Sequence, residues 1–152
     1  MVTGRTEGEW LQQGLDLYFK RIGFYLPVEW KIIPDIKNAK GLSIREFREK
    51  EGEMMLPLLE NKNEIYLLDE QGTEYTSRDL ARFLERKMVA GTRELIFIIG
   101  GAYGFSDKIY DKAAGTISLS KMTFPHQLVR LLFLEQLYRA LTIIRGEPYH
   151  HD

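Results

Sequence analysis

Residues 95–104 read Leu-Ile-Phe-Ile-Ile-Gly-Gly-Ala-Tyr-Gly, and this stretch decides the fold. Five apolar residues in succession are typical of a strand that is buried on both faces of a parallel sheet. The glycines that follow directly let a ligand approach the backbone and leave amides free to donate hydrogen bonds. Their spacing differs from that of the dinucleotide-binding fingerprint, and the motif lies late in the chain. Taken alone, the glycine turn indicates a strand end more often than a ligand site.

On both sides of this stretch, strand patterns alternate with helical periodicity, which predicts an α/β domain with a mostly parallel sheet. Further strands are expected at 28–32, 65–68 and 116–120, the second ended by residues 69–72. Helices are expected after capping boxes at 6–9 and 43–46, and then over 77–91, 106–114 and 124–145.

Glycine and proline mark the expected helix ends. Gly23 should close the first helix, and Pro57 should kink or end the second. At the last helix, Thr123 is the expected N-cap, Pro125 lies in the first turn, and Gly146 marks the stop.

The composition is that of one ordinary globular domain, which we place at residues 1–152. No apolar run is long enough to span a membrane, and the first residues lack the pattern of a secretory signal, so a cytoplasmic protein is expected. The absence of cysteine excludes disulfides and thiolate metal sites, and three histidines give no metal cluster. The net charge of -1 does not advertise nucleic-acid binding, although residues 118–145 carry an excess of positive charge.

Ligands of parallel α/β sheets bind at the carboxyl ends of the strands, where three loops fall at 69–72, 100–105 and 121–126. His126 and Arg130 lie four residues apart at the start of the last helix, whose exposed amides attract anions. They could orient a base and hold a phosphate, or they could be an ordinary surface pair. Glu135 and Arg139, also four apart, are expected to support the helix as an ion pair.

The last helix is apolar around most of its circumference, so it must be buried on several sides. We expect a homodimer through this helix, because so small a domain offers little to surround it. A central core helix without a partner is the alternative. Beyond it, Tyr149 and His150 could stack on an unpaired base, or belong to a frayed end.

The loops, the last helix and the tail together resemble the RlmH family, SPOUT-class methyltransferases that modify N3 of a pseudouridine in 23S rRNA. The more specific signals are Ser-Lys-Met-Thr-Phe-Pro-His at 120–126 and Gly-Glu-Pro-Tyr-His at 146–150. Matching segments, which span nearly the whole chain, are 50–53, 67–69, 97–101, 119–127, 135–140 and 145–150.

The resemblance implies a SPOUT-type sheet with helices on both faces, a C-terminal trefoil knot, a homodimer, S-adenosylmethionine as cofactor and the assembled ribosome as substrate. Our hypothesis is that the catalytic residues His126, Arg130, Tyr149 and His150 gather at the cofactor, with the tail supplied by either subunit. RNA contacts are expected from Arg130, Arg139, Tyr149 and His150. The implied cofactor ligands are Leu68, Gly100, Leu119, Ser120, Lys121, Met122, Thr123 and Phe124.

Two points stay open at the level of sequence. Members of the family begin with a short hydrophobic strand before a Gly-Arg turn, but here only Met1, Val2 and Thr3 precede Gly4, so that strand is curtailed or the chain starts at a downstream methionine. The general base is unassigned, and water could serve. The alternative function is that of a ribosome-associated binding protein with the same fold and no catalysis.

Overall fold

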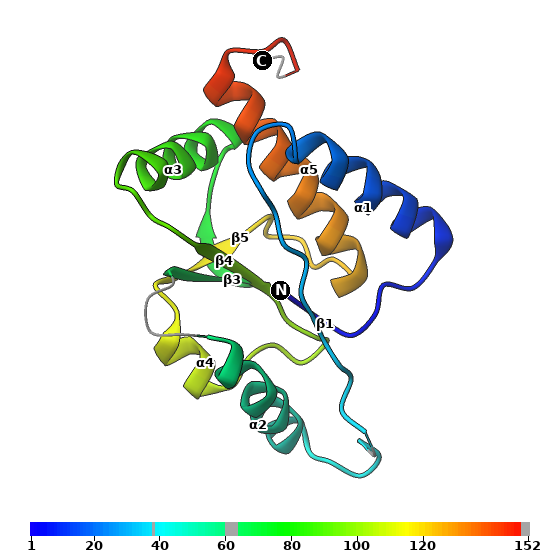
Figure 1. Ribbon diagram of the computed structural model, residues 1–152. Helices are drawn as coiled ribbons and strands as arrows, with labels where there is room; N and C mark the ends of the chain where they lie inside the picture. Colours follow the sequence, from blue (N-terminus) through cyan, green and yellow to red (C-terminus); the bar gives the residue numbers. More distant parts are fainter. Residues whose placement is uncertain (38, 60–63, 150–152) are drawn as a thin grey trace.

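In the computed structural model, helices cover both faces of one parallel sheet (Figure 1). The structure describes residues 1–37, 39–59 and 64–149. Along the chain the elements are β1 (Val2–Thr3), α1 (Glu9–Ile22), β2 (Ile32–Ile33), α2 (Ile44–Met55), the 3-10 helix η1 (Leu56–Leu58), β3 (Glu64–Glu74), α3 (Ser77–Val89), β4 (Leu95–Ile99), α4 (Asp107–Lys112), β5 (Gly115–Ser118) and α5 (His126–Arg145).

Within the described residues the sheet has the strand order β2-β1-β4-β3-β5, and every pairing is parallel. The apolar strand β4 lies in the middle of the sheet, with Ile65 opposite Ile96 and Leu68 opposite Ile99. The predicted parallel α/β fold is therefore confirmed. Because all strands run the same way, the carboxyl ends of β3, β4 and β5 meet at one edge.

The two faces of the sheet carry separate hydrophobic clusters. One lies under α1, α3 and α5 and includes Leu15, Leu84 and Leu137. The other lies under α2 and α4 and includes Met55 and Ile109. Helices on both faces are thus confirmed, whereas the C-terminal trefoil knot stays a prediction.

Local signals account for the starts of α2 and α3. The Ser43 hydroxyl accepts a hydrogen bond from the Glu46 amide at 3.2 Å, and Glu46 accepts one from the Ser43 amide at 2.8 Å. Thr76 and Asp79 form the same capping box at α3. The capping box predicted at residues 6–9 is wrong: α1 starts after Gly8 without a side-chain cap.

Three strand and helix bounds also differ from the prediction. Residues 28–31 are not strand, and β2 holds only Ile32–Ile33. Strand β3 does not stop at residue 68 but continues through an irregularity in its pairing with β5, between Leu68 and Thr73. Helix α5 begins at His126 with Pro125 as its N-cap, so neither Thr123 as the cap nor Pro125 within the first turn is correct.

The short first strand, β1, occupies the expected place in the sheet. Val2 pairs with Ile32 on one side and with Ile99 on the other. Two residues therefore suffice to separate β2 from β4, and β4 is not left with a bare edge.

Helix α5 is surrounded largely by its own chain, which corrects part of the argument for a dimer. It lies between α1 and α3 on the sheet, and Phe133, Leu137 and Leu141 are buried there. Leu128 and Leu132 remain half-buried. At the far end, Gly146 closes the helix in the left-handed conformation with φ +68°, as predicted. No helix in the described residues has the length and hydropathy to cross a membrane.

Candidate functional site

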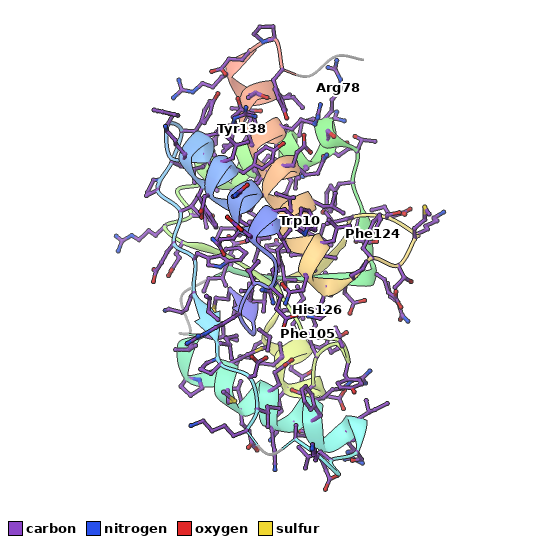
Figure 2. The ribbon with its side chains drawn as sticks, turned by 90° about the vertical axis from the view of Figure 1, so that its right-hand side faces the viewer. Trp10, Arg78, Phe105, Phe124, His126 and Tyr138 are labelled. Carbon is purple, nitrogen blue, oxygen red and sulfur yellow. The ribbon has the colours of Figure 1, made fainter. Side chains whose placement is uncertain are left out.

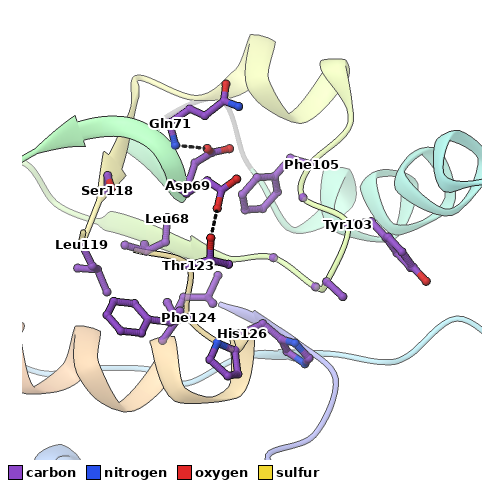
Figure 3. A pocket seen from close by; sticks show the side chains of 18 of the residues that line it. Leu68, Asp69, Gln71, Tyr103, Phe105, Ser118, Leu119, Thr123, Phe124 and His126 are labelled. Carbon is purple, nitrogen blue, oxygen red and sulfur yellow. Dashed lines mark hydrogen bonds between the residues drawn. The ribbon is translucent and has the colours of Figure 1, made fainter. Parts of the chain in front are cut away.

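A cleft of about 690 Å³ opens at the carboxyl edge of β3, β4 and β5 (Figure 3). This is the volume range of small-molecule and cofactor sites. Three chain segments line it, namely residues 68–71, 99–105 and 117–126 without Lys121, together with two side chains of α2, Tyr110 of α4 and Val129 of α5. All three predicted segments thus contribute to the cleft, but residues 69–72 belong to the irregular part of β3 and are not a loop after it.

Nearly all the predicted cofactor residues line this cleft. Lys121 is the exception, since its side chain is 87% exposed and its Nζ lies 3.8 Å from a Glu74 carboxylate oxygen. His126 lines the cleft at the first residue of α5. The predicted residues that do line it are Leu68, Gly100, Leu119, Ser120, Met122, Thr123 and Phe124.

The segment between β5 and α5 is held by short-range hydrogen bonds. The Ser118 hydroxyl donates to the Ser120 carbonyl at 2.9 Å, and the Met122 amide donates to the Ser120 hydroxyl at 2.9 Å. Thr123 donates to the Glu70 carboxylate at 3.1 Å, which ties this loop to the end of the first half of β3 (Figure 3). The small hydroxyls of the motif thus shape the loop, and Phe124 follows at the wall of the cleft.

Two carboxylates, Asp69 and Glu70, lie at the cleft beside apolar walls. Asp69 accepts hydrogen bonds from the Gln71 amide at 2.8 Å and from the Tyr110 hydroxyl. Burial, and then the bond to Asp69, raises the pKa of Tyr110 to about 12. Tyr110 therefore stays protonated near neutral pH and keeps donating to Asp69, which fixes this carboxylate at the rim.

Helix α2 contacts the glycine turn at residues 100–104, which the sequence did not predict. The Arg48 Nε donates to the Tyr103 carbonyl, and the Phe47 and Tyr103 rings pack edge to face with centroids 5.0 Å apart. Glu51 is 2% exposed and accepts a hydrogen bond from the Gly101 amide. The match of residues 50–53 to the family pattern was the available signal, but it carried no indication of this contact.

A family model described as "Predicted SPOUT methyltransferase" matches residues 1–150. The chain belongs to this SPOUT methyltransferase family. Similar proteins named ribosomal RNA large subunit methyltransferase H come from Flavobacterium johnsoniae, at 51% identity over 149 residues (98% of this chain, 95% of the relative), and Parabacteroides distasonis, at 47% over 152 residues (100% and 97%). A third, from Geotalea daltonii, is 51% identical over 148 residues (97% and 95%). The family resemblance is thereby confirmed over nearly the whole chain.

Arg130, which the SPOUT resemblance suggested as a catalytic and RNA-binding residue, is enclosed by the protein. It is 1% exposed and donates to the Thr3 carbonyl and, at 3.0 Å, to the Thr6 hydroxyl. Burial lowers the pKa of Arg130, and Asp35 and Glu7 oppose that shift. The guanidinium does not line the cleft, so the prediction of a surface phosphate contact disagrees with its position in this structure.

Tyr149 and Arg139 lie toward the opposite end of α5 from the cleft. Tyr149 donates to Glu135 at 3.2 Å, and the Arg139 guanidinium lies 4.9 Å from the Tyr149 ring centroid. The predicted pair of Glu135 and Arg139 is confirmed at 2.5 Å. Figure 2 shows the separation, with Tyr138 in the upper part of the molecule and His126 and Phe105 near its middle.

One chain therefore does not bring the four predicted catalytic residues together. His126 is at the cleft, Arg130 is buried one turn later, and Tyr149 packs back along the second half of the helix against Tyr138 and Glu135. His150 lies outside the described residues. Among the described residues, no group of three or more candidate ligands that could hold a metal ion is found.

Proposed function

We propose that this protein is an S-adenosylmethionine-dependent methyltransferase that modifies N3 of a pseudouridine in the 23S rRNA of assembled ribosomes in the cytoplasm. The observation that carries this proposal is the cleft itself, because it gathers the predicted cofactor residues from three separate segments. The printed name of the similar proteins, a methyltransferase of large-subunit ribosomal RNA, supports the same reaction class.

The residues of the cleft fit this cofactor. Apolar walls that include Leu68, Leu119 and Phe124 suit the flat adenine ring. The carboxylates of Asp69 and Glu70 suit ribose hydroxyls and the positive charges that S-adenosylmethionine carries. Gly100, without a side chain, allows the ligand to approach the backbone.

When bound, S-adenosylmethionine supplies an already activated methyl group, so the protein has to align N3 with it and let the N3 proton leave. His126, at the N-terminus of α5, is placed to orient the base or accept that proton. The predicted alternatives are His150 and water. Because Arg130 is buried, its proposed role is to support residues 3–6, which precede α1.

The position of the tail favours a site completed by a second subunit. The Tyr149 hydroxyl bonds Glu135, which lies nine residues after His126 and therefore about 14 Å along α5, so this side chain does not reach the cleft of its own chain. In a two-fold dimer packed through α5, the tail of one subunit would reach the cleft of the other. The half-buried side chains of Leu128 and Leu132 offer apolar surface for that contact.

A titration of S-adenosylmethionine separates this proposal from its alternative. We expect saturable binding at micromolar cofactor in a calorimeter, as for enzymes that use it as substrate. A ribosome-associated protein with the same fold and no catalysis would show no binding at high micromolar cofactor, and that result would sink the proposal.

Substitution of His126 by alanine should slow methylation of ribosomes in a single turnover about 100-fold, because a positioned acid–base group contributes at least this much. The dissociation constant of S-adenosylmethionine should change little. The matched control is His151→Ala. It removes a histidine that follows His150 in the tail and has no predicted role, so it should leave the rate unchanged.

Mixed dimers then show which subunit supplies the tail. One protomer carries His126→Ala, and the other carries Tyr149→Ala with His150→Ala. If the tail acts across the dimer, purified heterodimers hold one complete site and regain about half of the wild-type rate. Heterodimers as slow as either homodimer would contradict the shared site. An unchanged rate for His126→Ala and for His150→Ala would remove the general-base role of both histidines.

A further inference from the structure

Glu51 is a buried carboxylate on α2, directly behind the glycine turn of the cleft. Its side chain is 2% exposed, although carboxylates are almost never fully buried unless they are paired. Burial raises the pKa of Glu51, and the hydrogen bond from the Gly101 amide opposes that shift. In the described part of the chain, no ion pair to Glu51 is found. The Gly101 amide is therefore the hydrogen-bond donor that this carboxylate holds.

Helix α2 approaches the turn and the residues after it closely. A Cβ atom on Gly101 would lie 2.9 Å from the Glu51 Oε1. One on Gly52, the next residue of α2, would collide with the Ser106 hydroxyl. The helix and the segment that follows β4 are thus in direct contact on both sides of Glu51.

Arg48 lies one turn earlier on the same helix and holds another polar group of the turn. Its Nε donates to the Tyr103 carbonyl, and its neighbour Phe47 packs on the Tyr103 ring. Within the turn, the Gly104 amide reaches the Gly101 carbonyl at 3.4 Å, which is long for a hydrogen bond. The shape of the turn therefore depends on α2 more than on its own backbone.

We propose that Glu51 and Arg48 are positioning residues that clamp the Gly101 amide and the Tyr103 carbonyl, and so hold the glycine turn in the shape that the cofactor needs. The choice of cofactor rests on the proposed function above. A carboxylate suits this role because a charge-assisted bond to a buried amide is about twice as strong as a neutral one. Gly100 and Gly101 line the cleft, so a turn that relaxes would change the wall against which the cofactor lies.

Two measurements on Glu51→Ala and Glu51→Gln test the clamp. In the free protein, amide hydrogen exchange followed by mass spectrometry should become about tenfold faster over residues 100–105 in Glu51→Ala. By calorimetry, the same variant should bind S-adenosylmethionine about tenfold more weakly. Glu51→Gln keeps an acceptor oxygen for the Gly101 amide and should restore most of both properties, which a general loss of packing would not explain.

Glu49→Ala is the matched control, because Glu49 is an acid of the same helix that pairs with Lys108 at 3.6 Å and does not contact the turn. Should Glu51→Ala fail to fold, the exposed Arg48→Ala replaces it and should change exchange and affinity in the same direction. Unchanged exchange over residues 100–105 in the folded variants would overturn the clamp, as would a Glu51→Gln protein that behaves like Glu51→Ala. A wild-type protein that binds no S-adenosylmethionine would refute the proposed function. The clamp could still be tested in that case, because the hydrogen-exchange measurement needs no cofactor.

Discussion

Replacement of Gly72 by alanine should lower the free energy of unfolding by about 3 kcal/mol or more, at the upper end of the cost of overpacking. A Cβ atom at this position would lie 2.7 Å from the Ile117 amide nitrogen and 2.8 Å from the Thr116 and Ile117 carbonyl carbons. These are backbone atoms of β5, which cannot rotate aside as a side chain does. The pairing of β3 with β5 must open, and β5 leads directly into the loop that lines the cleft.

Urea unfolding followed by circular dichroism measures this cost, and the melting temperature should fall by about 10 °C. Thr73→Ala is the matched control, because it places the same side chain one residue further along, at an exposed position. We expect that control to stay within about 0.5 kcal/mol of the wild type. Equal stability of the two variants would show that β3 and β5 are not as close as described here.

Arg130→Ala should destabilise the protein by about 3 kcal/mol, because it leaves a cavity and two polar groups without their donor. The Thr3 carbonyl and the Thr6 hydroxyl lose their bonds to the guanidinium, which reaches them across more than 120 residues of sequence. Chemical unfolding is again the measurement. The loop between β1 and α1 should also become more accessible to hydrogen exchange.

Arg145→Ala serves as the comparison, because Arg145 lies exposed at the end of the same helix. Its loss should cost about 0.5 kcal/mol through the helix dipole. If Arg130→Ala were as stable as the wild type and only weakened binding to ribosomes, Arg130 would be the surface RNA contact that the sequence suggested. A large loss of stability identifies it as a structural residue.

Local sequence signals predicted the parts of the fold that depend on neighbours in sequence. The apolar run of β4 and the capping boxes at Ser43 and Thr76 are of this kind. The predicted capping box at Thr6 does not form, because the Thr6 hydroxyl accepts a hydrogen bond from Arg130, which lies far along the chain. The sequence suggested that helix α5 was too apolar to be buried within one chain. It packs between α1 and α3, and no local pattern predicts such contacts between segments far apart in sequence.

The candidate site divides in the same way. The rule that ligands lie at strand ends, together with the family resemblance, located the loops of the cleft and residues such as Leu68 and Thr123. Lys121 shares the motif but points to solvent beside Glu74, because the loop geometry decides where each side chain goes. The contacts of Arg48 and Glu51 with the glycine turn join α2 to a segment about 50 residues away, which no local pattern announces.

Transfer of labelled methyl from S-adenosylmethionine to ribosomes that lack the modification tests the central claim most directly, with the labelled nucleotide then mapped in the 23S rRNA. We expect one label per ribosome, on N3 of a pseudouridine, and none with protein-free RNA. The absence of transfer to ribosomes by a protein that binds S-adenosylmethionine, or a label on another nucleotide, would contradict the proposed function.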